Sequence, residues 1–312
     1  MAESSVRFVR KLALLAKKEV SYGTDSTPTG EANAIQASNA TLTPLAGADV
    51  SRDLLLPHLG HQGIILTGNY ATLQFDVEIA GAGAAGTPPA WGVLMEGCGF
   101  AETVTEDTDV AYSPVSSAFA ALSQYFNLDG VNHILLGARG TWSASLVPAQ
   151  IPRFTFNYTG LVGTIADTAL PSVDLSAFVT PVPVSKANTT MSLHGWTAIA
   201  ESLQIQAGNT IEPRMLIGEE SIKLSDRQAT GTAVVQAMSL ATKNWFSIAQ
   251  AATKGVLATQ HGTVAGNIVK FDGAAVQLGR PTQGATQGIA NYSLPLMFTP
   301  DEGNDELIIT VK

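Results

Sequence analysis

The side chains that could support chemistry are scattered along this chain and do not gather into one motif. Residues 81–86 read Gly-Ala-Gly-Ala-Ala-Gly, which matches the glycine spacing of a dinucleotide-binding turn. The strand predicted before them alternates apolar and polar residues, whereas a central parallel strand is apolar on both faces. Pro88 and Pro89 also stand where the phosphate-binding helix would already be running. We therefore interpret residues 81–86 as a flexible loop of small residues.

The residues that could bind a metal or act as a nucleophile also lack the partners that such a site needs. His58 and His61 have the spacing of two metal ligands, but zinc needs further ligands and the other histidines stand singly. Cys98 lies between two glycines without a nearby histidine, which fits a small buried residue. Four carboxylates lack the turn glycine and tight spacing of a calcium loop: Glu102, Glu106, Asp107 and Asp109. The sequence therefore predicts no catalytic residue, no cofactor and no metal site.

Two predicted strands carry polar side chains on one face. Within residues 71–80, apolar residues alternate with Gln74, Asp76 and Glu78, so these three share a face. Thr155 and Asn157 share the polar face of a second strand. Two interpretations stay open. The polar face is an ordinary solvated surface, or it is the wall of a channel whose negative charge repels phosphate.

Two long segments mix charges with leucine or methionine in a way that suits a docking loop as well as a plain surface loop. They cover residues 48–63 and 209–220. The candidate contact residues in them are Asp49, Arg52, Asp53, Leu55, His58, His61, Glu212, Arg214, Met215 and Glu219.

Charge is sparse and unevenly distributed over the 312 residues. Asp, Glu, Lys and Arg make up 14% of the chain, against about 25% in a typical soluble domain. The net charge is −9, yet residues 1–18 hold one acidic and five basic residues, so the remainder carries −13. An acidic body argues against nucleic-acid binding, and sparse charge is consistent with a surface buried against copies of the chain. The basic residues of the N-terminal stretch are Arg7, Arg10, Lys11, Lys17 and Lys18.

Export and membrane insertion are not predicted. The apolar run of residues 12–16 is too short for a signal peptide, and no apolar run reaches the roughly 18 residues of a membrane-spanning helix. The single cysteine fits a reducing compartment.

Strand patterns dominate the elements that must position these residues. Alternation predicts strands around residues 71–80, 151–161 and 288–298, with Pro295 suggesting an edge or a bulge in the last, and a short strand over 308–311. Two helices are expected, one after Thr87 and one running from Ser239 or Thr242 to about residue 255. The fold class is therefore mainly β.

A weak internal repeat accompanies these elements. Residues 41–55 resemble 203–216, and each is followed by an alternating strand, a helix led by tryptophan, and further strands. The order predicts two tandem β-sandwich or barrel domains, each with a flanking helix. The expected boundaries are an N-terminal arm over 1–40, a first domain over 41–163, an extended linker over 164–200 and a second domain over 201–312.

An ordered set of short motifs resembles the major tail tube proteins of bacteriophages with long non-contractile tails, such as Mu-like phages of Pseudomonas. The motifs that carry the resemblance are residues 14–19 (LLAKKE), 22–25 (YGTD), 89–92 (PAWG), 97–100 (GCGF), 137–140 (GARG) and 303–307 (GNDEL).

The resemblance implies a structural virion protein of the tail, assembled in the host cytoplasm, whose copies form rings that stack into a tube for DNA ejection. Two tube domains per chain imply trimeric rings that imitate hexamers, with hexamers as the alternative. The implied partners are other copies of the chain, the tape-measure protein, the tail terminator and the distal tail protein, with double-stranded DNA passing through unbound and no membrane.

On this interpretation, Gln74, Asp76, Glu78, Thr155 and Asn157 face the lumen. The segments 48–63 and 209–220, with the N-terminal arm, join stacked rings. Two alternatives remain: an inner tube of a contractile injection system, and a β-sandwich module that binds a carbohydrate or receptor. An enzyme is the weakest interpretation.

Overall fold

The computed structural model describes residues 6–312, which form antiparallel β-sheet and two short helices. The expected mainly β fold is confirmed. The first half of the chain supplies β1 (Leu12–Lys18), β2 (Ala34–Ile35), β3 (Ser38–Ser51), β4 (Ile64–Glu78), β5 (Phe100–Thr105), β6 (Asp109–Pro114), β7 (Leu122–Leu128), β8 (Val131–Leu146) and β9 (Arg153–Asp167).

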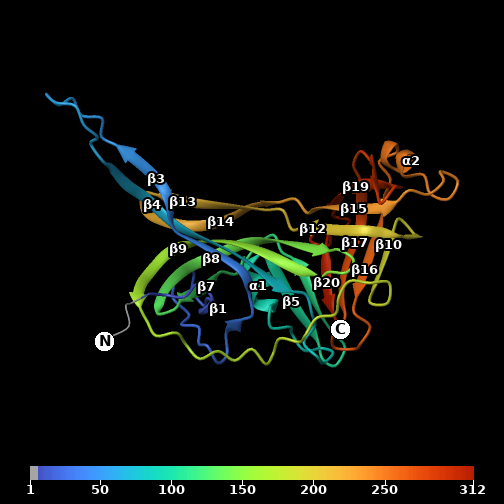
Figure 1. The fold of residues 1–312 in the computed structure, drawn as a ribbon, viewed down its shortest axis with the longest axis horizontal. Helices are drawn as coiled ribbons and strands as arrows, with labels where there is room; N and C mark the ends of the chain where they lie inside the picture. Colours follow the sequence, from blue (N-terminus) through green and yellow to red (C-terminus); the bar gives the residue numbers. More distant parts are fainter. Residues whose placement is uncertain (1–5) are drawn as a thin grey trace.

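The second half, coloured yellow to red in Figure 1, adds eleven strands. They are β10 (Thr189–Leu193), β11 (Trp196–Thr197), β12 (Ala200–Gln206), β13 (Asn209–Leu216), β14 (Glu219–Arg227), β15 (Thr230–Gln236), β16 (Lys254–His261), β17 (Val269–Leu278), β18 (Thr282–Thr286), β19 (Ile289–Thr299) and β20 (Ile308–Val311).

The alternating pattern around residues 71–80 is a strand in the structure, β4, which also extends further toward the N-terminus. Leu73, Phe75 and Val77 are buried. Gln74, between the first two, is exposed, and Asp76, between the last two, is half-buried. β9 repeats this arrangement, with Phe154 and Phe156 in the core. Period-2 alternation therefore places one apolar face on the core and leaves the other face polar.

One sheet and one core run through both halves of the chain. β8 pairs with β12, so that Leu146 lies opposite Leu203, and β20 pairs with β6. The rings of Phe154 and Phe271, one from each half, meet edge to face at 5.9 Å between centroids. The order of strand then helix in β4–α1 recurs in β15–α2, but the division into two domains stays a prediction, because the sheet and the core both cross the expected boundary.

The N-terminal segment differs from the expected arm. β1 pairs with β7 over its whole length and with β2, and Leu14 and Ala16 are buried. The arm was expected over residues 1–40, and β1 lies within that range. Burial follows from pairing with β7, which lies more than a hundred residues away along the chain.

Both expected helices are present and short. α1 (Gly92–Gly97) follows the prolines and buries Leu94 and Met95. α2 (Trp245–Gln250) begins later than expected, because the Asn244 side chain caps it by accepting a hydrogen bond from the Ser247 amide at 3.0 Å. Within residues 6–312, no helix is long and apolar enough to cross a membrane.

The stretch expected as a linker is extended only in part. Residues 168–188 run along the first half, where the Asp174 amide donates to the Gly30 carbonyl at 2.9 Å. From Thr189 onward the chain forms β10 and β11, and β10 pairs with β16. The end of the expected linker is therefore part of the sheet.

Pro295 lies within a paired strand, not at an edge or a bulge. β19 pairs with β15 on one side, and on the other side with β18 up to Ser293 and with β17 from Leu296. The Pro295 carbonyl accepts from the Gly279 amide at 2.8 Å, so its nitrogen also points toward the gap between β18 and β17. The missing N–H therefore costs the sheet no ladder hydrogen bond.

Candidate assembly surfaces

Five neighbouring strands, β4, β9, β8, β12 and β15, present their polar side chains on one common face. Residues directly opposite each other in antiparallel strands point to the same side, so the register defines rows across the sheet. One row runs from Asp76 through Thr155, Ser143 and Gln206 to Thr230. We call this surface the polar sheet face; it consists of Gln74, Asp76, Glu78, Thr141, Ser143, Ser145, Arg153, Thr155, Asn157, Gln204, Gln206, Thr230 and Thr232.

The structure therefore brings together all five residues that were expected to face the lumen, although whether they do so stays a prediction. The Asp76 carboxylate accepts hydrogen bonds from Thr155 Oγ1 at 2.6 Å and from Asn39 Nδ2 at 2.7 Å. Glu78 lies 3.6 Å from the Arg153 guanidinium. The polar sheet face thus holds two carboxylates and one guanidinium among hydroxyl and amide groups, so it is close to neutral.

Sequence reasoning missed the part of this face that β8, β12 and β15 supply. The signal was present, because Thr141, Ser143 and Ser145 alternate with buried Trp142 and Ala144. β8 and β12 lie beside the predicted strands because β8 pairs with β9 and β12 pairs with β8. No local sequence pattern specifies the pairing of β12 with β8, because these strands are distant along the chain.

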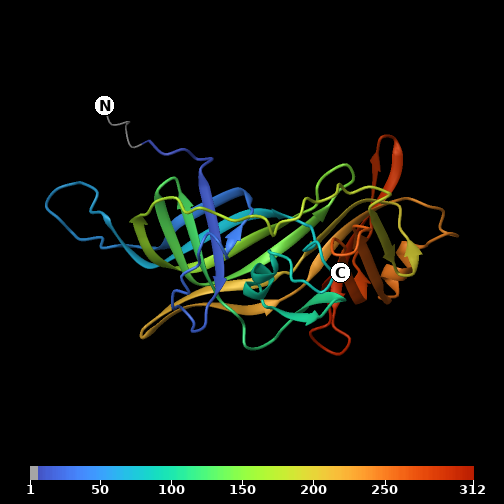
Figure 2. The ribbon, with the colours of Figure 1, turned by 90° about the horizontal axis from the view of Figure 1, so that it is seen from below.

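The first candidate docking segment is the end of a long hairpin made by β3 and β4. This hairpin projects beyond the body of the molecule in Figures 1 and 2. Residues 48–51 belong to β3, so only residues 52–63 form the loop that was expected over the whole segment. Asp49, Arg52, Asp53, Leu55, His58 and His61 are all exposed there.

The second candidate segment is a two-stranded ribbon, not a loop. β13 and β14 pair only with each other within the described residues, joined by a turn at Ile217 and Gly218. Glu212, Arg214 and Glu219 are exposed, and Glu219 accepts from Lys223 at 2.9 Å. Met215 packs its side chain against Gly68 of β4, so the free end of the ribbon reaches the root of the other hairpin.

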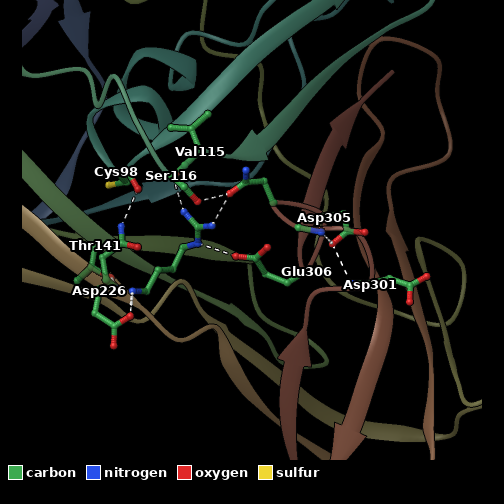
Figure 3. Close-up of polar contacts among 12 residues, drawn as sticks. Cys98, Val115, Ser116, Thr141, Asp226, Asp301, Asp305 and Glu306 are labelled. Atoms are coloured by element: carbon green, nitrogen blue, oxygen red, sulfur yellow. Dashed lines mark hydrogen bonds and ion pairs between the residues drawn. The ribbon is translucent and has the colours of Figure 1, made fainter.

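Polar contacts anchor the base of the ribbon to the body (Figure 3). Asn209 and Arg227 lie opposite each other at this base. The Asn209 side-chain amide donates to the carbonyls of Cys98 at 2.6 Å and Gly140 at 2.9 Å. Arg227 donates to the carboxylate of Glu306 at 2.6 Å and to the carbonyl of Val115 at 2.7 Å.

A second group of contacts holds the middle of the ribbon. The Tyr22 hydroxyl bonds both the amide and the carbonyl of Ile222 in β14. Arg139 lies over the Tyr22 ring, 4.9 Å from its centroid, and donates to the same carbonyl at 2.8 Å. Burial raises the pKa of Tyr22, so the hydroxyl stays protonated and keeps its donor. Because the body holds both the base and the middle of the ribbon, the orientation of the ribbon relative to the body is fixed.

The basic residues of the N-terminal stretch do not form one patch. Arg7 and Arg10 are exposed, Lys11 lies 3.7 Å from Asp129, and Lys18 pairs with Glu96 of α1. Lys17 is exposed at the end of β1. Whether this stretch joins stacked rings stays a prediction.

The remaining candidates from the sequence take structural roles in the described chain. The loop of residues 81–86 packs closely against the second half, where the amides of Gly81 and Gly83 donate to Asn267 and Gly266. Cys98 is fully buried against Tyr158, and burial raises the pKa of its thiol to about 12. Glu102 accepts from the Tyr112 hydroxyl at 2.7 Å. Among residues 6–312, no group of three or more His, Cys, Asp or Glu side chains is arranged to hold a metal ion.

This architecture defines a class of protein: a mainly β chain with one continuous polar sheet face and projecting hairpins. The sequence profile of a family described as phage tail tube protein matches residues 10–299. The chain therefore belongs to the phage tail tube protein family and is a structural component of the virion tail. Membership of this family implies self-association into a tube and contact with other tail proteins. A comparison with curated proteins finds no match.

Proposed function

We propose that copies of this chain close into rings that stack as the tail tube, with the polar sheet face turned toward the channel through which DNA passes. The observation that carries the proposal is the continuity of this face across strands from both halves of the chain. A channel wall must have one chemistry along its circumference, and a face shared by both halves satisfies that requirement.

The chemistry of the polar sheet face suits passage without binding. Proteins hold DNA by neutralising phosphates with lysine and arginine. Among the thirteen residues of the polar sheet face Arg153 is the single cation, and Glu78 lies beside it. Arg139, on the same side of β8, lies over the Tyr22 ring and donates to the carbonyls of Ile222 and Phe119. Hydroxyl and amide groups make up most of the rest, and the Asp76 carboxylate leaves a small excess of negative charge. DNA would therefore meet a hydrated wall without a strong phosphate site.

Ring closure could use two of the open strand edges, those of β3 and β18. Within residues 6–312, β3 pairs only with β4, and β18 pairs only with β19, so each leaves one row of backbone N–H and C=O groups unpaired. Unpaired edges favour strand addition from another chain. Pairing between β3 of one copy and β18 of the next would extend the sheet around a ring.

The proposed ring is a trimer in which both halves of each chain contribute to the lumen, with a hexamer as the alternative. The proposed partners are the tape-measure protein, the tail terminator and the distal tail protein, and assembly takes place in the host cytoplasm. The exposed tip of the β3–β4 hairpin, the β13–β14 ribbon and the N-terminal stretch would join successive rings.

Negative-stain electron microscopy of the concentrated purified protein tests this proposal. We expect stacked rings with a central hole, and class averages of end-on views with threefold symmetry. Sixfold averages would favour the hexamer. A species that stays monomeric at every concentration tested would contradict the tube.

A further inference from the structure

We propose that the apolar tip of the β3–β4 hairpin inserts into an apolar groove beside β10 and β12 of the next copy along the tube. This inference rests on the proposed tube function and names the surface that receives the tip. Two features support the inference. The sheet formed by β4, β9, β8 and β12 has an exposed apolar projection at one end and an apolar depression at the other end.

The projection is rich in leucine and isoleucine that nothing covers within the described chain. Leu55 and Leu59 have their full side-chain surface exposed, at 102% each. A contiguous apolar patch on a soluble protein marks an interaction site. We call this set the leucine tip: Val50, Leu54, Leu55, Leu56, Leu59, Ile64, Ile65 and Leu66, all exposed.

The depression lies where the end of β8 meets β10, β12 and the segment before them. It has a volume of about 690 Å³, within the range of sites that enclose a ligand. Its wall is mainly apolar, and half-exposed Ile199 forms part of its lining. We call it the β12 groove; its apolar lining includes Leu146, Val184, Met191, Ile199 and Leu203.

The register places the leucine tip and the β12 groove at opposite ends of the same strands. β4 begins in the leucine tip at Ile64 and ends at Glu78. Glu78 lies opposite Arg153, which lies opposite Ser145, the neighbour of groove residue Leu146. The fifteen residues of β4 span about 50 Å, so a chain cannot fill its own groove with its own tip.

A second copy of this chain is the occupant that fits. If one copy is displaced along the direction of β4 by about the length of that strand, its leucine tip reaches the β12 groove of its neighbour. The contact joins two different surfaces, and repeated head-to-tail contacts of this kind build open filaments rather than closed dimers.

The charges agree with this pairing. Lys186 is the one charged residue in the groove lining. The hairpin end carries two carboxylates, Asp49 and Asp53, against one guanidinium, Arg52, and is therefore net negative. Opposite charges at the rim favour the correct register between copies.

Disulfide trapping tests the contact directly. The chain has one native cysteine, and Cys98 is fully buried with a raised pKa, so it does not compete. Tubes of the combined variant Leu55→Cys with Ile199→Cys are oxidised and run on a non-reducing gel. We expect a ladder of dimers, trimers and higher oligomers. Each single variant should stay monomeric, as should a control pairing Leu55→Cys with Val104→Cys, because Val104 is similarly exposed but lies outside the groove.

Three results would overturn the contact. The first is covalent dimers from Leu55→Cys alone, which would indicate that two tips contact each other. The second is a ladder of oligomers in the Val104 control. The third is the absence of a ladder from the combined variant although micrographs show that it forms tubes. A second variant covers the case in which the combined variant does not assemble. Ile199→Asp should form rings that fail to stack, whereas Val104→Asp should stack normally. Normal tubes from Ile199→Asp would contradict the proposal, while absence of tubes from the unsubstituted protein would instead refute the tube itself.

Discussion

At the scale of residues, the ion pair between Arg227 and Glu306 joins parts of the chain that are distant in sequence. Both side chains are about nine-tenths buried, and the guanidinium also satisfies the Val115 carbonyl and the Asn304 side chain. Neither charge could be left alone in this position, because the cost of burying an uncompensated charge is several kcal/mol. The pair therefore holds the ribbon base, the end of β6 and the segment before β20 in one arrangement.

We expect Glu306→Gln and Arg227→Met each to lower the free energy of unfolding by about 3–5 kcal/mol, since each leaves a partner buried without its counter-charge. Urea unfolding of dissociated protein measures the loss. The combined variant Arg227→Met with Glu306→Leu should lose less free energy of unfolding than the sum of the losses in the two single variants.

The matched control for this prediction is an exposed ion pair on the same ribbon. Lys223→Met removes the partner of Glu219, and both side chains are largely exposed. Its unfolding midpoint should be unchanged within error. An unchanged midpoint for Glu306→Gln would show that the buried pair does not hold the ribbon base.

At the scale of elements, β1 is the segment whose role the structure changes most. Its residues Leu14 and Ala16 are part of the core, and its ladder covers the outer edge of β7. The residues before β1 are held less tightly: the Phe8 amide donates a hydrogen bond to the Asp129 carboxylate, and Arg7 and Arg10 are exposed. Folding and assembly therefore depend on different parts of the N-terminal stretch.

Deleting residues 1–10 should leave the fold intact and shorten or abolish the tubes, because it removes exposed basic residues and spares β1. Deleting residues 1–18 should instead yield insoluble or unfolded protein, because the core then loses a strand and β7 gains an open edge. Circular dichroism separates these outcomes, and electron microscopy of the shorter deletion reports stacking. Full-length tubes from the first deletion would show that these residues are not needed for stacking.

At the scale of the whole molecule, the two halves share a sheet, a core and the polar sheet face. The pairing of β8 with β12 continues the row of Asp76, Thr155 and Ser143 from the first half to Gln206 in the second half. A relative rotation of the halves would break both this ladder and the core contact between Phe154 and Phe271. The face proposed for the lumen is therefore a rigid surface, and its charge is set by very few residues.

Asp76→Lys combined with Glu78→Lys should leave rings and tubes intact and slow DNA ejection several-fold, because each chain loses two negative charges and gains two positive charges that would bind phosphate along the channel. Dye-based ejection kinetics of phage carrying the variant measure the rate. Glu106→Lys with Glu302→Lys makes the same change in net charge at exposed positions outside the polar sheet face. Equal ejection rates for the two variants would refute the lumen assignment.

Local patterns were enough to predict much of the fold. Alternation at residues 73–79 and 154–158 placed β4 and β9 with the correct face inward, since period 2 is a property of each strand alone. The final strand, Ile308–Val311, was predicted with its observed bounds. The helix after Thr87 was likewise anticipated by its prolines.

Other features could not be predicted because they depend on partners far along the chain. Nothing near Asn209 or Arg227 indicates that the carbonyls of Cys98 and Val115 will receive their hydrogen bonds. The second docking segment was expected to be a loop because it mixes charges with leucine and methionine, whereas in the structure its residues pair with β14 to form a ribbon.

The strand-rich class, the inward and outward faces of individual strands and the motifs that resemble tail tube proteins can all be recognised in the amino-acid sequence. Three features emerge from the folded chain alone: β1 belongs to the core, five strands from both halves make one polar sheet face, and the leucine tip and the β12 groove lie at opposite ends of that face. Side-chain alternation is encoded within a few residues, whereas hydrogen bonding and burial over the whole chain select the neighbours of each strand.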